Sequence, residues 1–124
     1  MSNKTILIID DSNTNLVLLE SLFKRNGYSV HSATCAKEGM KTLEEEMHPD
    51  LIYLDLLMPD VDGFEFLRIL RDNSEWKDIP VIILSAVNEE EVISKSIALG
   101  AKDYLTKPLD IEYIIRLTNN MLSN

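Results

Sequence analysis

Residues 51–63 read LIYLDLLMPDVDG, and this stretch indicates the architecture of the whole chain. A mostly apolar run leads directly into Asp55, and a segment rich in turn-forming residues follows it. A short apolar run bounded by turn residues is typical of a strand that is buried on both faces of a parallel sheet. The sequence therefore predicts a central strand that presents a carboxylate at its C-terminal end.

Other apolar runs of the chain also end in polar side chains. Residues 6–9 precede Asp10 and Asp11, residues 81–84 precede Ser85, and residues 103–106 precede Lys107 and Pro108. A weaker strand over residues 29–33 alternates polar and apolar residues, as an edge strand does. Because the carboxyl ends of parallel strands lie at one edge of a sheet, we treat these strand ends as one predicted site.

Helical segments are predicted between the strands, from apolar periodicity and from capping residues. They cover residues 13–26 with Ser12 as the cap, 35–47, 63–73, 89–100 with a capping box at Asn88, and 111–122 with Asp110 as the cap. The predicted inward residues are Leu16, Leu19 and Phe23 in the first helix, Ala36, Met40, Leu43 and Met47 in the second, and Phe64, Leu67 and Leu70 in the third. Val17 and Leu18 fall off the core face of the first helix.

Strands that alternate with helices predict an α/β fold with a parallel sheet, right-handed crossovers and helices on both faces. We expect a five-stranded, doubly wound sheet of the flavodoxin-like (βα)5 type, with the order 2-1-3-4-5. Residues 1–124 fit one domain by length. In such a sheet the site lies between strands one and three, where the strand order reverses.

Composition excludes several partners. The chain has 12 basic and 21 acidic residues, a net charge of −9, and no cluster of Lys or Arg. Direct binding to nucleic acid or to an anionic membrane is therefore not expected. The single Cys35 cannot form an internal disulfide, and no stretch approaches the roughly 20 apolar residues of a membrane span. We expect a cytoplasmic protein.

The predicted site suggests phosphoryl chemistry. Carboxylates that meet at about 4 Å repel each other by roughly 4 kcal/mol per pair at an effective dielectric near 20, so Asp10, Asp11 and Asp55 favour a divalent cation. Mg²⁺, or Mn²⁺, prefers such oxygen ligands. Lys107 and Ser85 would then face the oxygens of a phosphoryl group carried by Asp55. Aspartate is a known nucleophile in phosphoryl transfer.

Together these residues resemble the receiver domain of bacterial two-component response regulators, and chemotaxis regulators in particular. The resemblance covers essentially the whole chain. It is carried by Asp10-Asp11, by Asp55 within DLLMPDVDG, by Ser85-Ala86 and by GAKDYLTKP at residues 100–108. It implies a phosphorylation-dependent signalling switch rather than an enzyme that turns over a substrate.

The resemblance also implies roles for individual residues. Asp55 would accept the phosphoryl group from a phosphohistidine on a histidine kinase or a histidine phosphotransfer protein. The Mg²⁺ ligands would be Asp11, Asp55 and the backbone carbonyl of Leu57, with Asp10 acting through a metal-bound water. Ser85 and Lys107 would contact the phosphoryl oxygens, Tyr104 would be the switch aromatic, and the Lys107–Pro108 bond would be cis.

Partners follow from the same resemblance. Receiver domains bind phosphodonors through the first helix and the loop after Lys107, so Val17 and Leu18 could form a docking patch. Scattered exposed apolar residues are also common on surfaces that bind no partner, so it stays open that Val17 and Leu18 have no docking role. The face made by the fourth helix, fifth strand and fifth helix would bind an output partner. The protein would be a monomer or a phosphorylation-dependent dimer.

Two other functions fit the same topology less well. A phosphatase of the haloacid dehalogenase type forms an aspartyl phosphate, but it needs a second Asp two residues after the nucleophile, where this chain has Leu57. A flavin-binding domain needs a Ser/Thr/Gly-rich phosphate loop after the first strand, where Asp10 and Asp11 would repel a phosphate. The cognate kinase and the output stay open.

Overall fold

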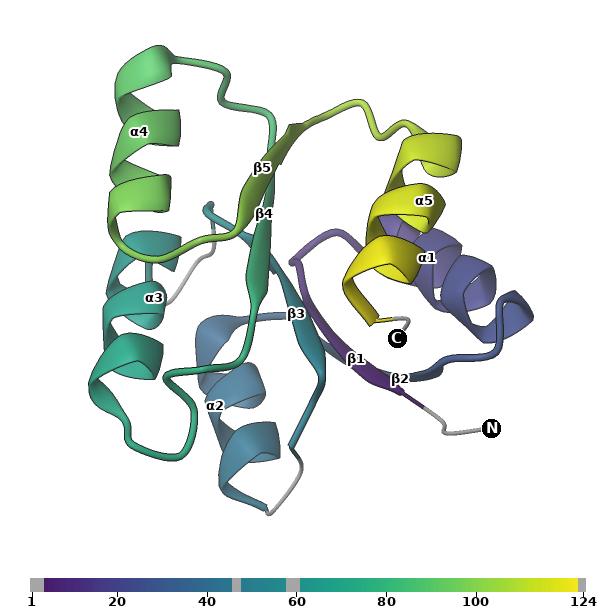
Figure 1. Cartoon of the computed structure of the whole chain (residues 1–124), viewed down its shortest axis with the longest axis horizontal. Coiled ribbons are helices and arrows are strands. Elements are labelled where there is room, and N and C mark those ends of the chain that lie inside the picture. The colour runs from purple at the N-terminus through teal and green to yellow at the C-terminus, as the bar shows by residue number, and fades with distance from the viewer. Residues whose placement is uncertain (1–3, 46–47, 58–60, 123–124) are drawn as a thin grey trace.

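The computed structural model of the chain describes residues 4–45, 48–57 and 61–122, and within them five parallel strands form one sheet in the order β2-β1-β3-β4-β5 (Figure 1). The strands are β1 (Thr5–Ile9), β2 (Ser29–Ala33), β3 (Leu51–Asp55), β4 (Val81–Ser85) and β5 (Asp103–Thr106). The helices between them are α1 (Asn13–Arg25), α2 (Ala36–Glu44), α3 (Gly63–Asp72), α4 (Glu90–Ala98) and α5 (Ile111–Leu122). The predicted α/β fold and strand order are confirmed.

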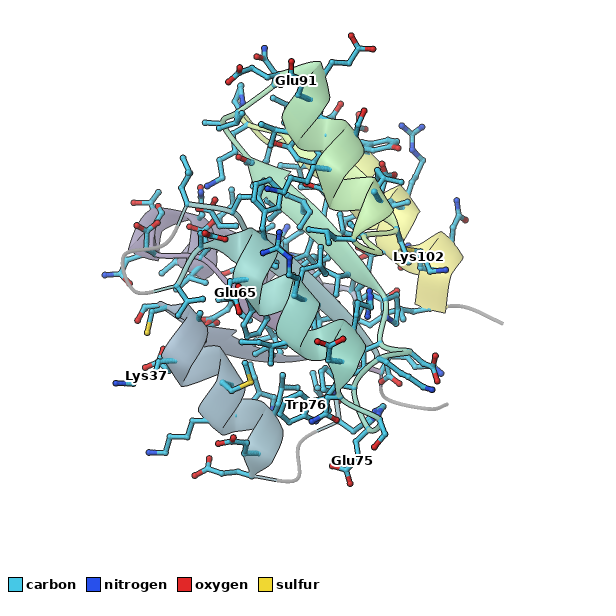
Figure 2. The ribbon with its side chains drawn as sticks, turned by 90° about the vertical axis from the view of Figure 1, so that its left-hand side faces the viewer. Lys37, Glu65, Glu75, Trp76, Glu91 and Lys102 are labelled. Carbon is cyan, nitrogen blue, oxygen red and sulfur yellow. The ribbon has the colours of Figure 1, made fainter. Side chains whose placement is uncertain are left out.

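Helices cover both faces of the sheet. Figure 1 shows α1 and α5 on one side and α2, α3 and α4 on the other. The view onto the second side shows α3 between α2 and α4, with Trp76 near the end of α3 (Figure 2). In the part of the chain that the structure describes, no helix combines the length and hydropathy that a bilayer span requires.

The core lies on both sides of the sheet because the central strands are buried on both faces. Successive residues of β1 point to opposite sides, so that Leu7 and Ile9 pack under α2 and α3 while Ile6 and Ile8 pack under α1 and α5. All residues of β3 are buried. The apolar run that leads into Asp55 is therefore a central strand, as predicted.

A buried polar pair joins the sheet to α5. The hydroxyl of Tyr53 in β3 lies 2.5 Å from Oγ1 of Thr118, whose hydroxyl in turn donates to the carbonyl of Ile114 at 2.7 Å. Because the threonine proton is used on that carbonyl, the tyrosine must be the donor of the shared bond. Burial raises the pKa of the Tyr53 hydroxyl, which keeps it in the protonated, donating form.

The register of the strands brings their C-terminal ends to one edge. Ile9 lies beside Leu54 in the pairing of β1 with β3, and Asp55 lies beside Leu84 in the pairing of β3 with β4. Ser85 lies beside Thr106 in the pairing of β4 with β5. The residues that follow β1, β3, β4 and β5 are thus held at the same edge of the sheet.

The structure differs from the prediction in two details of the helices. Phe64 packs against the core as predicted, but it is only partly buried and lies under the ammonium of Lys95, 4.3 Å from its ring centre. Phe66, which the predicted inward residues do not include, is the fully buried aromatic of α3. In addition, α4 begins one residue later than its predicted cap implies. Glu89 occupies the cap position, and its backbone carbonyl accepts from the first turn without a side-chain bond.

The other boundaries agree more closely. Ser12, Asp62 and Asp110 each accept a backbone N–H from the first turn of the following helix. The predicted helix over residues 35–47 ends at Glu44, and Met47, predicted to lie on its core face, falls outside the described residues. The remaining ends agree with the prediction to within two residues.

Candidate functional site

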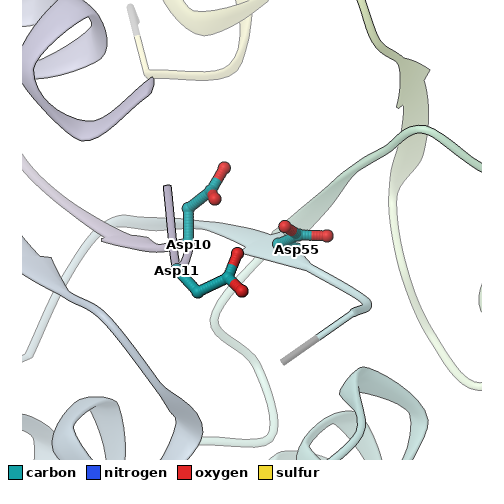
Figure 3. Close-up of side chains that lie close together, drawn as sticks. All are labelled: Asp10, Asp11 and Asp55. Carbon is teal, nitrogen blue, oxygen red and sulfur yellow. The ribbon is translucent and has the colours of Figure 1, made fainter. Parts of the chain in front are cut away.

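A group of carboxylates lies at the C-terminal ends of β1 and β3. Asp10 and Asp11 follow β1, and Asp55 ends β3 (Figure 3). One carboxylate oxygen of each residue lies within 4.8 Å of the others. Asp10 is fully buried and Asp55 is 4% exposed, whereas Asp11 is exposed. The structure thus brings together the acids that the sequence places far apart.

Lys107 adds a cation to this group from the loop after β5. Its Nζ lies 3.2 Å from Oδ2 of Asp10 and 3.2 Å from Oδ2 of Asp55. Three carboxylates and one ammonium leave a formal excess of negative charge in a largely buried space. An excess of this kind favours a further cation.

Other groups hold two of the carboxylates in place. Oδ1 of Asp10 accepts the backbone N–H of Ser12 at 2.9 Å, and its Oδ2 accepts the side-chain amide of Asn15 at 3.3 Å. Oδ1 of Asp55 accepts the backbone N–H of Leu57 at 3.1 Å. Buried carboxylates are normally satisfied in this way, and within the described residues no buried side-chain polar atom lacks a partner.

The pKa values of Asp55 and Lys107 are both raised, but for different reasons. Burial raises the pKa of the Asp55 carboxyl above its ordinary value; the N–H of Leu57 and the ammonium of Lys107 lower it by less, and Asp10 raises it further. Burial alone would lower the pKa of Lys107, but Asp10 and Asp55 together raise it. The lysine faces two carboxylates, while Asp55 faces a second carboxylate as well as the lysine. The site therefore favours added positive charge.

The donor set fits Mg²⁺ or Mn²⁺. The grouped ligand atoms are all carboxylate oxygens, which hard divalent cations prefer, and two of the acids are held in position by backbone N–H groups. Asp11 is exposed, which leaves an open side for water ligands. The Leu57 side chain is 59% exposed and its N–H is used on Asp55, so any contribution to the ion must come from its carbonyl.

Ser85 and Tyr104 meet through the backbone of Val87. Ser85 is fully buried at the end of β4, and its Oγ accepts the N–H of Val87 at 3.1 Å. The Tyr104 hydroxyl donates to the carbonyl of the same Val87 at 2.5 Å. Sequence reasoning names both side chains but misses this link, because it runs through main-chain atoms that carry no sequence signal.

The remaining predicted residues lie at the rim of the site or on α1. The Lys107–Pro108 peptide bond is cis, the conformation that the resemblance to receiver domains implies. Val17 and Leu18 are 63% and 43% exposed on α1. Their side chains do not contribute to the acid group. Asn15, which sequence reasoning also misses, lies one turn of α1 after Ser12 and reaches Asp10.

Comparison with known proteins gives a family match and several relatives. A model of the family described as "Response regulator receiver domain" matches residues 6–119. The chain is 35% identical over 118 residues to Protein PilH of Pseudomonas aeruginosa, covering 95% of this chain and 97% of that protein. It is 34% identical over 118 residues to Response regulator SaeR of Staphylococcus epidermidis, covering 95% of this chain and 50% of SaeR.

Solved structures with the same fold include receiver domains. The receiver domain of the Francisella response regulator 1452 is 33% identical, with a TM-score of 0.88 and 96% of each chain covered. The chemotaxis response regulator CheY4 of Vibrio cholerae is 26% identical, with a TM-score of 0.89, covering 98% of this chain and 100% of that one. The chain spans about half the length of several curated relatives that it matches, among them SaeR.

Proposed function

The chain belongs to the response regulator receiver domain family, and on this premise we propose that Asp55 is the residue that accepts the phosphoryl group. As a member of this family the chain is a phosphoacceptor receiver domain of two-component signalling. The observation that supports Asp55 is its place at the end of β3, with its carboxylate beside Asp10, Asp11 and the ammonium of Lys107.

In the proposed step a carboxylate oxygen of Asp55 attacks phosphorus in line with the leaving group. A P–O bond forms to Asp55, the P–N bond of a donor phosphohistidine breaks, and the ring nitrogen keeps the bonding electron pair. Lys107 turns from the carboxylates toward a phosphoryl oxygen, and the Ser85 hydroxyl donates to another. The product is an aspartyl phosphate.

We assign the metal site to Asp11, Asp55 and the carbonyl of Leu57, with Asp10 holding a water of the ion. Mg²⁺ or Mn²⁺ bound there would offset the charge that builds up on the transferred group. Support comes from the grouped carboxylate oxygens and from their excess negative charge. Asp10, held by Ser12 and Asn15, would keep its orientation throughout.

The proposed switch runs from Ser85 to Tyr104 through Val87. When the Ser85 hydroxyl turns to the phosphoryl group it gives up the N–H of Val87, and the loop whose carbonyl holds Tyr104 is then free to move. Shifting such an equilibrium from 1:99 to 99:1 takes roughly 5.5 kcal/mol. Two or three charge-assisted hydrogen bonds of about 1.5 to 3 kcal/mol each supply it. The surface of α4, β5 and α5 would carry the change to a partner.

The donor in this proposal is a histidine kinase or a histidine phosphotransfer protein in the cytoplasm. We expect a partner or a linked domain to produce the output response, since the net charge of −9 argues against DNA binding by this chain itself. Relatives include the Alkaline phosphatase synthesis transcriptional regulatory protein PhoP of Bacillus subtilis, of which this chain covers 43%. The chain would act as a monomer or as a dimer formed on phosphorylation.

Phosphorylation by a small donor tests the proposal. The wild-type protein, incubated with acetyl phosphate and Mg²⁺, is expected to gain the mass of one phosphoryl group, because a small donor needs no docking surface to reach the strand ends. The Asp55→Asn variant, which keeps the shape of the side chain but lacks the nucleophile, should gain none. Equal labelling of both proteins, or labelling of neither, would reject the assignment.

Docking of the donor on α1 gives a second prediction. Leu18→Asp places a charge in the exposed apolar patch of Val17 and Leu18, and should slow transfer from the cognate phosphodonor protein about tenfold, the effect of roughly 1.4 kcal/mol. Labelling by acetyl phosphate should not change. Ile69→Asp, an exposed position on α3 across the sheet, is the matched control and should leave both rates unchanged. Equal losses in both assays for Leu18→Asp would reject docking at α1.

The phosphatase alternative is not favoured. Its second catalytic Asp would stand at position 57, where the side chain is an exposed leucine. A phosphatase would release phosphate continuously from simple esters, whereas a receiver is labelled once. Steady turnover of an ester such as p-nitrophenyl phosphate, lost in Asp55→Asn, would revive the alternative.

A further inference from the structure

We propose that Asn15 is a positioning residue for the acid group: its side-chain amide holds Asp10 in the orientation that Mg²⁺ binding requires. The inference rests on the proposed function, because it presumes a cation among Asp10, Asp11 and Asp55. Asn15 lies outside the strand ends, in the first turn of α1.

The local geometry separates the two hydrogen-bonding groups of Asn15. Its backbone N–H donates to Oγ of the cap residue Ser12 at 3.3 Å, so the main chain is used in starting the helix. Its half-buried side chain turns the other way, and Nδ2 lies 3.3 Å from Oδ2 of Asp10. A carboxylate can only accept, so the amide group must present its NH₂ there.

Asp10 needs this donor more than an exposed acid would. It is fully buried, and its two oxygens are met by three donors: Ser12 on Oδ1, and Asn15 and Lys107 on Oδ2. Lys107 is shared with Asp55 at the same 3.2 Å distance. If the ammonium turns to a phosphoryl group on Asp55, Asn15 is the donor that remains on that oxygen. Without Asn15, only the N–H of Ser12 on Oδ1 would hold Asp10, and its buried Oδ2 would have no donor to fix its direction.

Helix formation does not explain an asparagine at this place. Asn is a poor residue for the body of a helix, and its backbone N–H would meet Ser12 with any side chain. Asn13 offers a comparison within the same turn, since it is exposed and belongs to no hydrogen bond of the acid group. The two asparagines therefore form a matched pair for substitution.

The test measures Mg²⁺ binding to the unphosphorylated protein by isothermal titration calorimetry. Asn15→Ala is expected to weaken the affinity about tenfold, the lower end of the effect of removing a partner that orients a metal-site ligand. Asn13→Ala should bind as the wild type does. Both variants gain helix propensity, and thermal unfolding without Mg²⁺ checks that each is folded.

A double-mutant cycle with Asp10→Asn shows whether Asn15 acts through Asp10. In the Asp10→Asn background, Asn15→Ala should change Mg²⁺ affinity less than twofold. If Asn15→Ala lowered Mg²⁺ affinity equally in both backgrounds, the inference would be overturned. Unchanged Mg²⁺ affinity in the single variant Asn15→Ala would overturn it as well. Absence of Mg²⁺ binding in the wild type would instead contradict the proposed metal site, and the inference would fall with it.

Discussion

Asp55 occupies a position that costs the fold stability. The residue is 4% exposed and its carboxylate lies near two other acids. Burial raises its pKa despite the N–H of Leu57 and the ammonium of Lys107. A group whose native pKa is raised binds its proton more tightly in the folded chain than in the unfolded one. Its contribution to stability is therefore present at low pH and is lost as pH rises from the ordinary value of 3.8 through the raised value.

This imbalance gives a stability prediction. At neutral pH without Mg²⁺, Asp55→Asn should raise the free energy of unfolding by about 1 kcal/mol, because a neutral isostere avoids both the burial of charge and the repulsion from Asp10. Urea unfolding measures the change. The gain should shrink as pH falls and the wild-type carboxyl takes up a proton.

Asp72→Asn, at an exposed position at the end of α3, is the control and should change stability little. Destabilisation by Asp55→Asn would mean that the Lys107 pair outweighs burial, contrary to the electrostatics described above.

At the residue scale the sequence predicts side chains that stand at strand ends. Asp10, Asp11, Asp55 and Lys107 follow apolar runs, and parallel topology then brings them together. Contacts made by main-chain atoms, such as those of Val87 with Ser85 and Tyr104, leave no such pattern. The hydrogen bond from Asn15 to Asp10 leaves no such pattern either, because Asn15 stands within a helix and not at a strand end.

At the scale of elements, Arg71 joins α3 to two loops on the far side of the sheet from α1. Its Nη1 donates to the carbonyls of Lys77 and Ile79 at 2.9 and 3.0 Å, and its Nη2 donates to the carbonyl of Gly100 at 2.9 Å. Gly100 has a φ of +107°, and a Cβ there would lie 2.5 Å from Nε of Arg71. The guanidinium thus connects the loop before β4 with the turn before β5.

Removing this connection should destabilise the protein. Arg71→Met keeps much of the apolar stem but leaves the three carbonyls without their donor, and we expect a loss of about 2 kcal/mol in the free energy of unfolding. Chemical denaturation measures it. Arg68→Met, one turn earlier on the same helix, removes only an exposed pair with Glu65 at 3.5 Å and should cost no more than about 0.5 kcal/mol. Equal effects of the two substitutions would contradict the role of Arg71.

Sequence periodicity predicts where the helices and strands lie better than it predicts their buried residues and caps. Apolar spacing placed each helix, but the predicted inward residues of α3 include Phe64 and omit Phe66, which is the fully buried one. Phe64, Phe66 and Leu67 lie within four residues, so their spacing alone does not fix the centre of the buried face. The cap of α4 was misplaced for a related reason, since four polar residues in a row at 88–91 offer several possible starts.

At the scale of the whole molecule, the fold brings together site residues that lie far apart in the sequence. β1, β3 and β5 are separated along the chain, yet their register sets Asp10, Asp55 and Lys107 within hydrogen-bonding reach. Helices on both faces bury the sheet and leave its C-terminal edge for chemistry. The strand order was predictable because doubly wound sheets have few arrangements. The contacts within the site were not, because they depend on side-chain orientation.

The location of the phosphoryl group in the wild-type chain tests the central claim most directly. After incubation with acetyl phosphate and Mg²⁺, borohydride reduces an aspartyl phosphate to homoserine, which peptide mass spectrometry can locate. We expect homoserine at position 55, and none when EDTA removes the cation. Homoserine at Asp10, Asp11 or another acid instead of position 55, or labelling that is unaffected by EDTA, would contradict it.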